Sequence, residues 1–177
     1  MVIEETAEIG MATESLANYP ELVTLPCYEW QHVLVMPKNH PLAGVKQITL
    51  ERLHEHPLVT YHPSFTGRSR IDQAFAHQGL TPQIALEAID SDVIKTYVSL
   101  GMGVGVVAEM AVQDGLPDQL ISRPAGQLFG TNPARVAFKR GSYLRHFVLG
   151  VAQMLSNRLS RDLVLKALEG RHTHYEL

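Results

Sequence analysis

The sequence contains a single cysteine, Cys27, among its 177 residues, and this scarcity limits its chemistry. One thiol cannot form an intrachain disulfide or supply a cysteine-based metal site. A buried structural thiol is a commoner role for such a residue than a nucleophile. The sequence also begins with Glu4 and Glu5 in place of the positively charged leader of a secreted protein. We therefore expect a cytoplasmic protein.

Long apolar runs and an excess of positive charge are also absent. The longest apolar stretch, residues 104–108, is far shorter than the roughly 20 residues that cross a membrane. The formal net charge of −3 does not favour a surface that binds nucleic acid. With 45% hydrophobic residues, the chain is large enough for one core or for two small lobes.

Short apolar segments alternate with helical patterns of about ten residues, which predicts an α/β fold with a mostly parallel sheet. The chain opens directly on a strand, with no helix before it to cover the sheet, so the start of the fold is expected to be incomplete. The expected strands are 7–13, 32–36, 58–61, 83–88, 104–108 and 136–138, and the expected helices begin near 49, 67, 91, 143 and 161.

Two patterns resemble functional motifs but fit a structural interpretation better. The glycines at 101, 103 and 105 follow an expected helix and lead into a strand, whereas a dinucleotide-binding loop runs from strand to helix. Nine histidines invite a metal site, but His54 and His56 are only two residues apart, and His172 and His174 lie in the C-terminal tail. No set of nucleophile, base and orienting group is visible, so we expect neither a metal or cofactor nor an enzyme.

The segment Ser64 to Ser69 is the most informative part of the chain. It places Thr66 and Gly67 at the expected start of a helix, where unpaired N–H groups and the helix dipole favour a bound anion, and Arg68 adds positive charge. A plain cap, in which Thr66 satisfies its own helix, is the simpler alternative. For Trp30, the only tryptophan, simple core packing is likewise the alternative to a functional role.

Several blocks of the sequence resemble the effector domain of LysR-type transcription regulators. The resemblance covers about residues 7–168 and is carried by the blocks 9–14, 25–30, 57–61, 65–69, 92–98 and 100–106. The Leu-Pro-Cys-Tyr-Glu-Trp and Phe-Thr-Gly-Arg-Ser blocks are similar to the CysB/Cbl branch, whose members regulate cysteine biosynthesis and sulfate-limitation genes.

This resemblance implies a periplasmic-binding-protein-like, two-lobe α/β domain with a ligand cleft and two crossover strands. Residues 1–28 and 131–155 are expected to be the remnant of an incomplete first lobe, 29–130 the second lobe, and 156–177 a C-terminal helix and tail. The family's winged helix-turn-helix is not part of the resemblance. We therefore expect no DNA binding by this chain alone, and we expect a homo-oligomer of two or more copies.

The resemblance also implies a small-molecule effector: sulfate, acetylserine or N-acetylserine, or adenylylsulfate. The site residues that it places here are Thr13, Trp30 and Thr66, with the backbone of Gly67 and Arg68 beside them. The predicted function is inducer sensing without catalysis, in a regulator of sulfur assimilation. A solute-binding protein for an oxyanion and a small α/β hydrolase are the alternatives.

Overall fold

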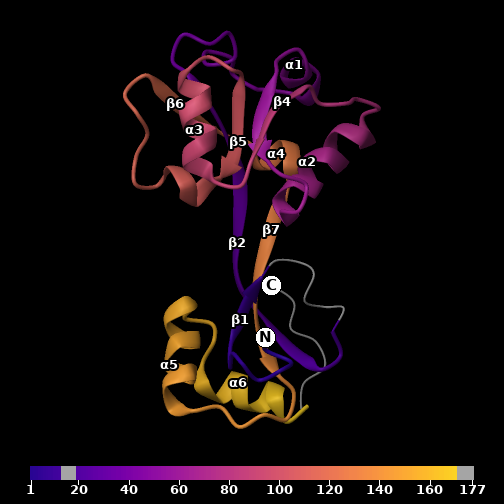
Figure 1. Ribbon diagram of the computed structural model, residues 1–177, viewed down its shortest axis with the longest axis vertical. Helices are drawn as coiled ribbons and strands as arrows, with labels where there is room; N and C mark the ends of the chain where they lie inside the picture. The colour runs from indigo at the N-terminus through magenta and orange to yellow at the C-terminus, as the bar shows by residue number, and fades with distance from the viewer. Residues whose placement is uncertain (13–18, 171–177) are drawn as a thin grey trace. The chain divides into compact units, whose positions relative to one another are not determined.

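The computed structural model describes residues 1–12 and 19–170. The chain divides into two compact units, one formed by Met1–Glu29 with Asn132–Leu177 and the other by Trp30–Thr131 (Figure 1). These bounds lie one residue from the lobe boundaries expected from the sequence. That the two units act as ligand-binding lobes stays a prediction.

The Trp30–Thr131 unit is built on a mixed sheet in the order β6–β2–β5–β3–β4. Strand β3 runs parallel to β4 and β5, whereas β2 is antiparallel to both β5 and β6. The expectation of a mostly parallel sheet therefore holds only for the three strands that alternate with helices. The strands are β2 (Leu22–Pro37), β3 (Leu58–Tyr61), β4 (Ile84–Ala88), β5 (Val104–Ala108) and β6 (Leu120–Pro124).

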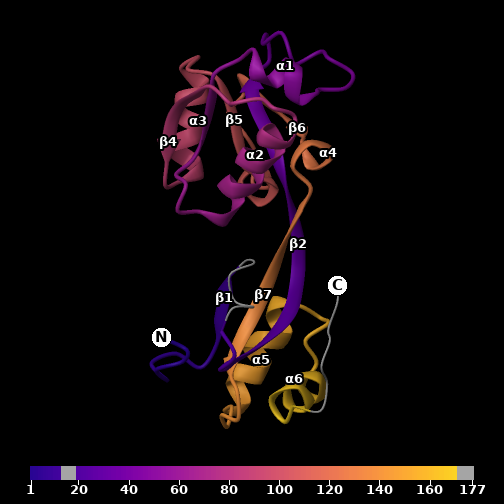
Figure 2. The ribbon, with the colours of Figure 1, turned by 90° about the vertical axis from the view of Figure 1, so that its right-hand side faces the viewer.

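Helices cover both faces of this sheet, as the side-chain alternation of β2 requires. Leu34 and Met36 face a core shared with α1 (Leu50–His54), α2 (Thr66–His77) and α4 (Gly126–Phe129). Val33 and Val35 face the opposite core, which is closed by α3 (Ser91–Ser99) (Figure 2). A short 3-10 helix, η2 (Glu109–Val112), follows β5.

Local sequence signals set several of the helix ends in this unit. The Thr49 hydroxyl accepts a hydrogen bond from the N–H of Arg52 at the start of α1, and the Asp90 side chain accepts one from the N–H of Asp92 at the start of α3. Both helices begin within a residue of the positions expected from the sequence. Gly103 follows α3, and a Cβ atom there would lie 2.2 Å from the carbonyl oxygen of Pro57. The glycine-rich block is thus a helix end packed closely against a strand, as the sequence indicated.

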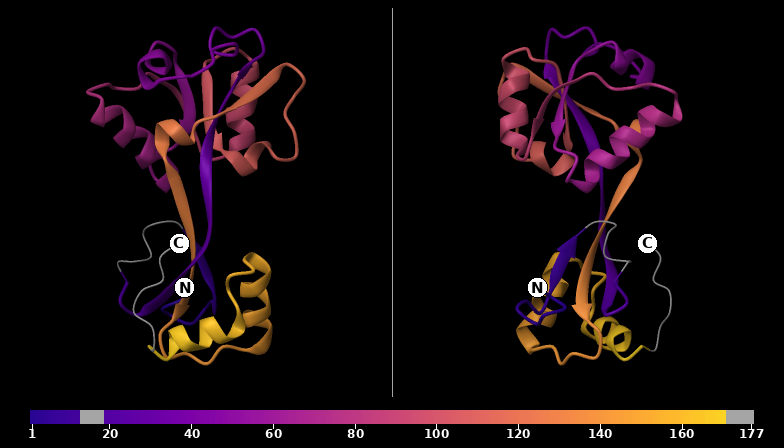
Figure 3. Two further views of the ribbon diagram at one scale, coloured as in Figure 1. Left: turned by 180° about the vertical axis from the view of Figure 1, so that it is seen from behind. Right: turned by 45° about the vertical axis from the view of Figure 1, so that its right-hand side comes forward.

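The other unit contains β1 (Gly10–Ala12), β7 (Thr131–Lys139), α5 (His146–Leu155) and α6 (Arg161–Leu168), and it also receives the first part of β2. β7 lies between β1, with which it pairs antiparallel, and β2. Val136 and Phe138 share a core with both helices. Figure 3 shows these helices, in orange and yellow, beside the lower end of β7. Helix α6, expected to stand apart with the tail, places Val164 and Leu168 in this core.

Candidate functional site

The N-cap residue at the start of α2 provides no side-chain cap, unlike those of α1, α3 and α6. Its N-cap residue is Phe65, with extended backbone angles (φ −92°, ψ 131°) and no side-chain hydrogen bond to the first turn. Thr66 is already helical, so the alternative that Thr66 is the N-cap is wrong. Because an aromatic side chain cannot satisfy backbone N–H groups, the first turn keeps donor capacity at the positive end of the helix dipole.

Gly67, in this first turn, packs directly against two side chains of β2. A Cβ atom on Gly67 would lie 3.0 Å from Cη2 of Trp30 and 3.1 Å from Nε2 of His32. Few real Cβ atoms have neighbours this close, so the contact depends on the missing side chain of glycine. Trp30 and Gly67, predicted from separate blocks of the sequence, are thereby brought together.

Arg68, the next residue, is buried and bound within its own unit. Its Nε donates to Asp72 Oδ1 at 2.8 Å, and its Nη1 donates to Glu87 Oε1 at 2.7 Å. Burial opposes its charge, but the hydrogen bonds that it donates to Asp72 and Glu87, together with the charges of these carboxylates, outweigh burial and raise the pKa of Arg68. Its backbone N–H donates to the carbonyl oxygen of Phe65 at 3.0 Å.

These contacts give Arg68 a different role from the one expected from the sequence. There, its positive charge was expected to help bind an anion. Two carboxylates offset its guanidinium charge, and Nη1 also donates to the Tyr61 carbonyl oxygen at 3.0 Å. Arg68 therefore ties α2 to β3 and β4 and fixes where the helix begins.

His32 is a residue of this region that was not expected from the sequence. It is fully buried, and its ring lies edge-on to Trp30 (centroids 5.0 Å apart) and to Phe129 of α4 (5.5 Å). Burial lowers the pKa of His32 to about 4, although a hydrogen bond with the backbone of Gly67 acts in the opposite direction. The ring is therefore neutral near pH 7.

The alternation of side chains along a strand could have predicted the position of His32. Residues two apart in a strand face the same side of a sheet, so His32 shares its face with Trp30 and Leu34. Of the other expected site residues, Thr66 provides the first helical N–H of α2, and Thr13 lies outside the described residues.

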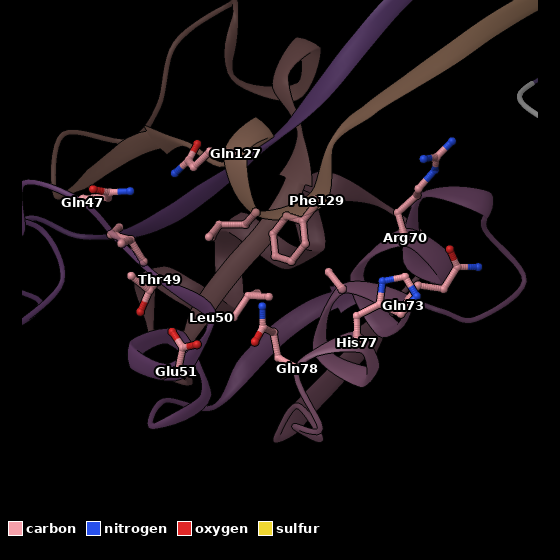
Figure 4. Close-up of a pocket in the computed structure, with 13 residues that line it drawn as sticks. Gln47, Thr49, Leu50, Glu51, Arg70, Gln73, His77, Gln78, Gln127 and Phe129 are labelled. Carbon is pink, nitrogen blue, oxygen red and sulfur yellow. The ribbon is translucent and has the colours of Figure 1, made fainter.

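A separate cavity of about 550 Å³ opens between α1, α2 and α4 (Figure 4). Glu51 and Arg70 lie on opposite sides of Phe129 in this view. A hydrogen bond from Thr49 lowers the pKa of Glu51, which lines the cavity together with the basic residue Arg70. Among the described residues, its lining includes neither Trp30 nor Gly67. We therefore place the candidate anion site at the start of α2.

The remaining sequence candidates for chemistry have structural surroundings. Cys27 is buried in the Met1–Glu29 and Asn132–Leu177 unit, its Sγ lies 3.5 Å from the Leu155 carbonyl oxygen, and burial raises the pKa of the thiol. A thiol held protonated in this way is a poor nucleophile. Within residues 1–12 and 19–170, no group of three or more His, Cys, Asp or Glu side chains is placed to hold a metal ion. In the same part of the chain, no helix has the length and apolar character needed to span a membrane.

Comparison with known proteins identifies the family. Residues 1–160 match the LysR substrate binding domain. The chain is 49% identical to the transcriptional regulator CysB of Burkholderia cenocepacia over 177 residues, which are all of this chain and 56% of the relative. It is 44% identical to the regulator Cbl of Escherichia coli over 164 residues, which are 92% of this chain and 52% of the relative. The chain thus spans about half the length of these curated relatives.

A solved structure supports the same assignment. The cofactor-binding domain of the Cbl transcriptional regulator matches with a TM-score of 0.86 and 41% identity, over 95% of this chain and 74% of that one. These relatives are transcriptional regulators and not enzymes, in agreement with the prediction of a non-catalytic module. The chain belongs to the LysR family of transcription regulators, as a substrate-binding domain of the group that contains CysB, Cbl and SsuR.

Proposed function

We propose that this domain senses an inducer for a regulator of sulfur assimilation by binding a small oxyanion at the start of α2. The observation that carries the proposal is the uncapped first turn beginning at Thr66, with Gly67 packed against Trp30. Sulfate and the carboxylate of acetylserine or N-acetylserine are the candidate ligands, and adenylylsulfate offers a similar sulfate group.

The chemistry of this position suits an anion that must bind and leave again. The backbone N–H groups of Thr66 and Gly67 lie at the positive end of a 12-residue helix, where anions are favoured. Arg68 is already paired with carboxylates, and His32 is neutral. Neither residue therefore offers an unpaired positive charge that would make anion binding too tight to reverse. Partly buried Trp30 offers an indole N–H donor on an apolar plate.

The wider role follows from the family and is proposed on that basis. In the complete regulator, DNA is bound by a helix-turn-helix domain. The substrate-binding domain described here signals to that DNA-binding domain that the effector is bound. We propose that the regulator acts in the cytoplasm and that this domain associates with further copies of itself. Thr13, which the resemblance places at the same ligand, belongs to this proposal as well.

Calorimetric titration of the chain with sulfate and with N-acetylserine tests the proposal. At constant ionic strength, we expect saturable binding of at least one of them and none of chloride. Trp30 is the only tryptophan of the chain, so its fluorescence should change over the same concentration range. Identical responses to sulfate, N-acetylserine and chloride would contradict the proposed function.

A further inference from the structure

A fully buried histidine is costly to place beside a helix start, because burial disfavours its charged form and its ring nitrogens need hydrogen-bond partners. His32 lies in this position. Trp30 touches one side of its ring, Phe129 touches another, and Gly67 approaches its Nε2. A leucine of similar size would fill the space without this cost.

The contacts of His32 form a continuous row that begins at the proposed site. From Trp30 the row passes through His32 to Phe129, and Phe129 lies 6.4 Å from Phe75 of α2, centroid to centroid. The backbone of His32 joins the same part of the fold, since its carbonyl oxygen accepts the N–H of Ala125 at 3.0 Å, just before α4. His32 therefore contacts both the tryptophan and the turn that carries Phe129.

We propose that His32 is a positioning residue for the effector site: it holds the indole of Trp30 against Gly67, so that the indole and the first turn of α2 face the same ligand. This inference rests on the proposed function, since it assigns the role of a residue at that site. Because the ring is neutral, His32 adds no positive charge beside Trp30. The ligand's negative charge is then recognised by the backbone N–H groups at the start of α2.

Trp30 itself is the probe for a test without ligand, since no other tryptophan contributes to the fluorescence. In His32→Ala, the indole loses its edge contact, so its emission should shift to the red and its anisotropy should fall. His32→Phe keeps an aromatic ring between Trp30 and Phe129 and should restore most of both signals. His146→Ala, at an exposed residue that begins α5 in the other unit, is the matched control and should leave both unchanged.

The second arm measures sulfate affinity in the same variants. Because His32 acts by preorganising the site, His32→Ala should weaken sulfate binding about tenfold, and His32→Phe should recover to within about threefold of wild type. If His32→Ala fails to fold by circular dichroism, Gly67→Ala disturbs the same contact from the other side and should change Trp30 fluorescence with His32 intact.

The two arms separate this inference from the proposed function. Absence of sulfate and N-acetylserine binding in wild type would count against the proposed function, while the ligand-free fluorescence still decides whether His32 positions Trp30. Wild-type fluorescence and anisotropy in folded His32→Ala would overturn the inference, whatever the affinity. Equal loss of signal in His32→Phe and His32→Ala would overturn the role assigned to the ring.

Discussion

Cη2 of Trp30 lies 3.0 Å from the point that a Cβ atom on Gly67 would occupy, so the first turn of α2 and strand β2 meet where only glycine fits. This contact joins two sequence blocks that lie more than thirty residues apart. Even a methyl group added at position 67 should therefore disturb the start of α2.

Gly67→Ala should therefore behave unlike an ordinary glycine replacement in a helix. Alanine normally stabilises a helix over glycine by about 0.5–1 kcal/mol, through the unfolded state and helix propensity. Here the added methyl group must displace Trp30 or the helix start, so we expect a lower free energy of unfolding and weaker sulfate binding.

Gly150→Ala is the matched control, because Gly150 is exposed within α5 and an added Cβ would have no neighbour within 4 Å. Urea denaturation should show stabilisation for Gly150→Ala and destabilisation for Gly67→Ala. Stabilisation of similar size in both variants would show that Trp30 moves away from the added methyl group without a measurable cost in stability.

Arg68→Leu should destabilise the domain by about 1–3 kcal/mol, because it leaves the carboxylates of Asp72 and Glu87 and the Tyr61 carbonyl oxygen without their donor. Arg68→Lys should recover only part of this, since an ammonium group cannot reproduce the planar fork of donors. Arg52→Leu, at an exposed position of α1, serves as control and should have little effect. Equal midpoints of chemical denaturation for wild type and Arg68→Leu would contradict the supporting role of Arg68.

Acid should weaken the domain through His32. The pKa of His32 is about 4 in the folded chain and near 6.5 for an ordinary histidine, so the unfolded state binds the extra proton between these values. Stability from neutral His32 is thus fully present above about pH 6.5 and is lost as pH falls toward 4, by about 3 kcal/mol in total.

His32→Phe isolates this contribution from that of the carboxylates, which titrate in the same range. Measured by urea denaturation from pH 7 to pH 4, the free energy of unfolding should fall more steeply for wild type than for His32→Phe. Parallel curves for the two proteins would exclude a neutral, buried His32.

DNA binding provides a prediction at the level of the whole domain. With a net charge of −3 and no recognition helix in the described part of the chain, the protein should show no sequence-specific retardation of operator DNA at about 0.15 M salt. A gel-shift assay with a scrambled duplex as control measures this. Specific retardation by this chain alone would require a DNA-binding surface that its charge does not suggest.

Local signals made part of this fold predictable from the sequence. Thr49 and Asp90 cap their helices through residues only a few positions away, and the glycines after α3 mark its end. By contrast, β2 is one continuous strand of 16 residues that includes Pro26, whereas only residues 32–36 of it were given as an expected strand. Proline restricts the backbone locally, but the pairing of β2 with its neighbours decides how far the strand extends.

The candidate site was only partly predictable, because its contacts are set by tertiary structure. The sequence pointed to Trp30 and Gly67 separately, through the resemblance and through the helix-start pattern. It gave no sign that Glu87, on β4, would bind Arg68, or that Phe65 would occupy the N-cap of α2 without capping it. Such pairings depend on which strands lie side by side, and no short sequence pattern encodes that.

The central claim, that backbone N–H groups at the start of α2 bind the anion, is tested most directly at Thr66. Proline is well tolerated at the first helical position, and the extended backbone of Phe65 suits a following proline, so Thr66→Pro removes the N–H donor together with the hydroxyl group without breaking the helix. Thr66→Ala keeps that donor and removes only the hydroxyl group. In calorimetric titrations with sulfate, we predict that Thr66→Ala loses about 1.5–3 kcal/mol of affinity for one charge-assisted hydrogen bond. Thr66→Pro, which lacks the N–H as well, should lose about 1.5–3 kcal/mol more than Thr66→Ala, with both variants folded. Equal sulfate affinity in folded Thr66→Pro and Thr66→Ala would contradict the claim, because the N–H would then contribute nothing to binding.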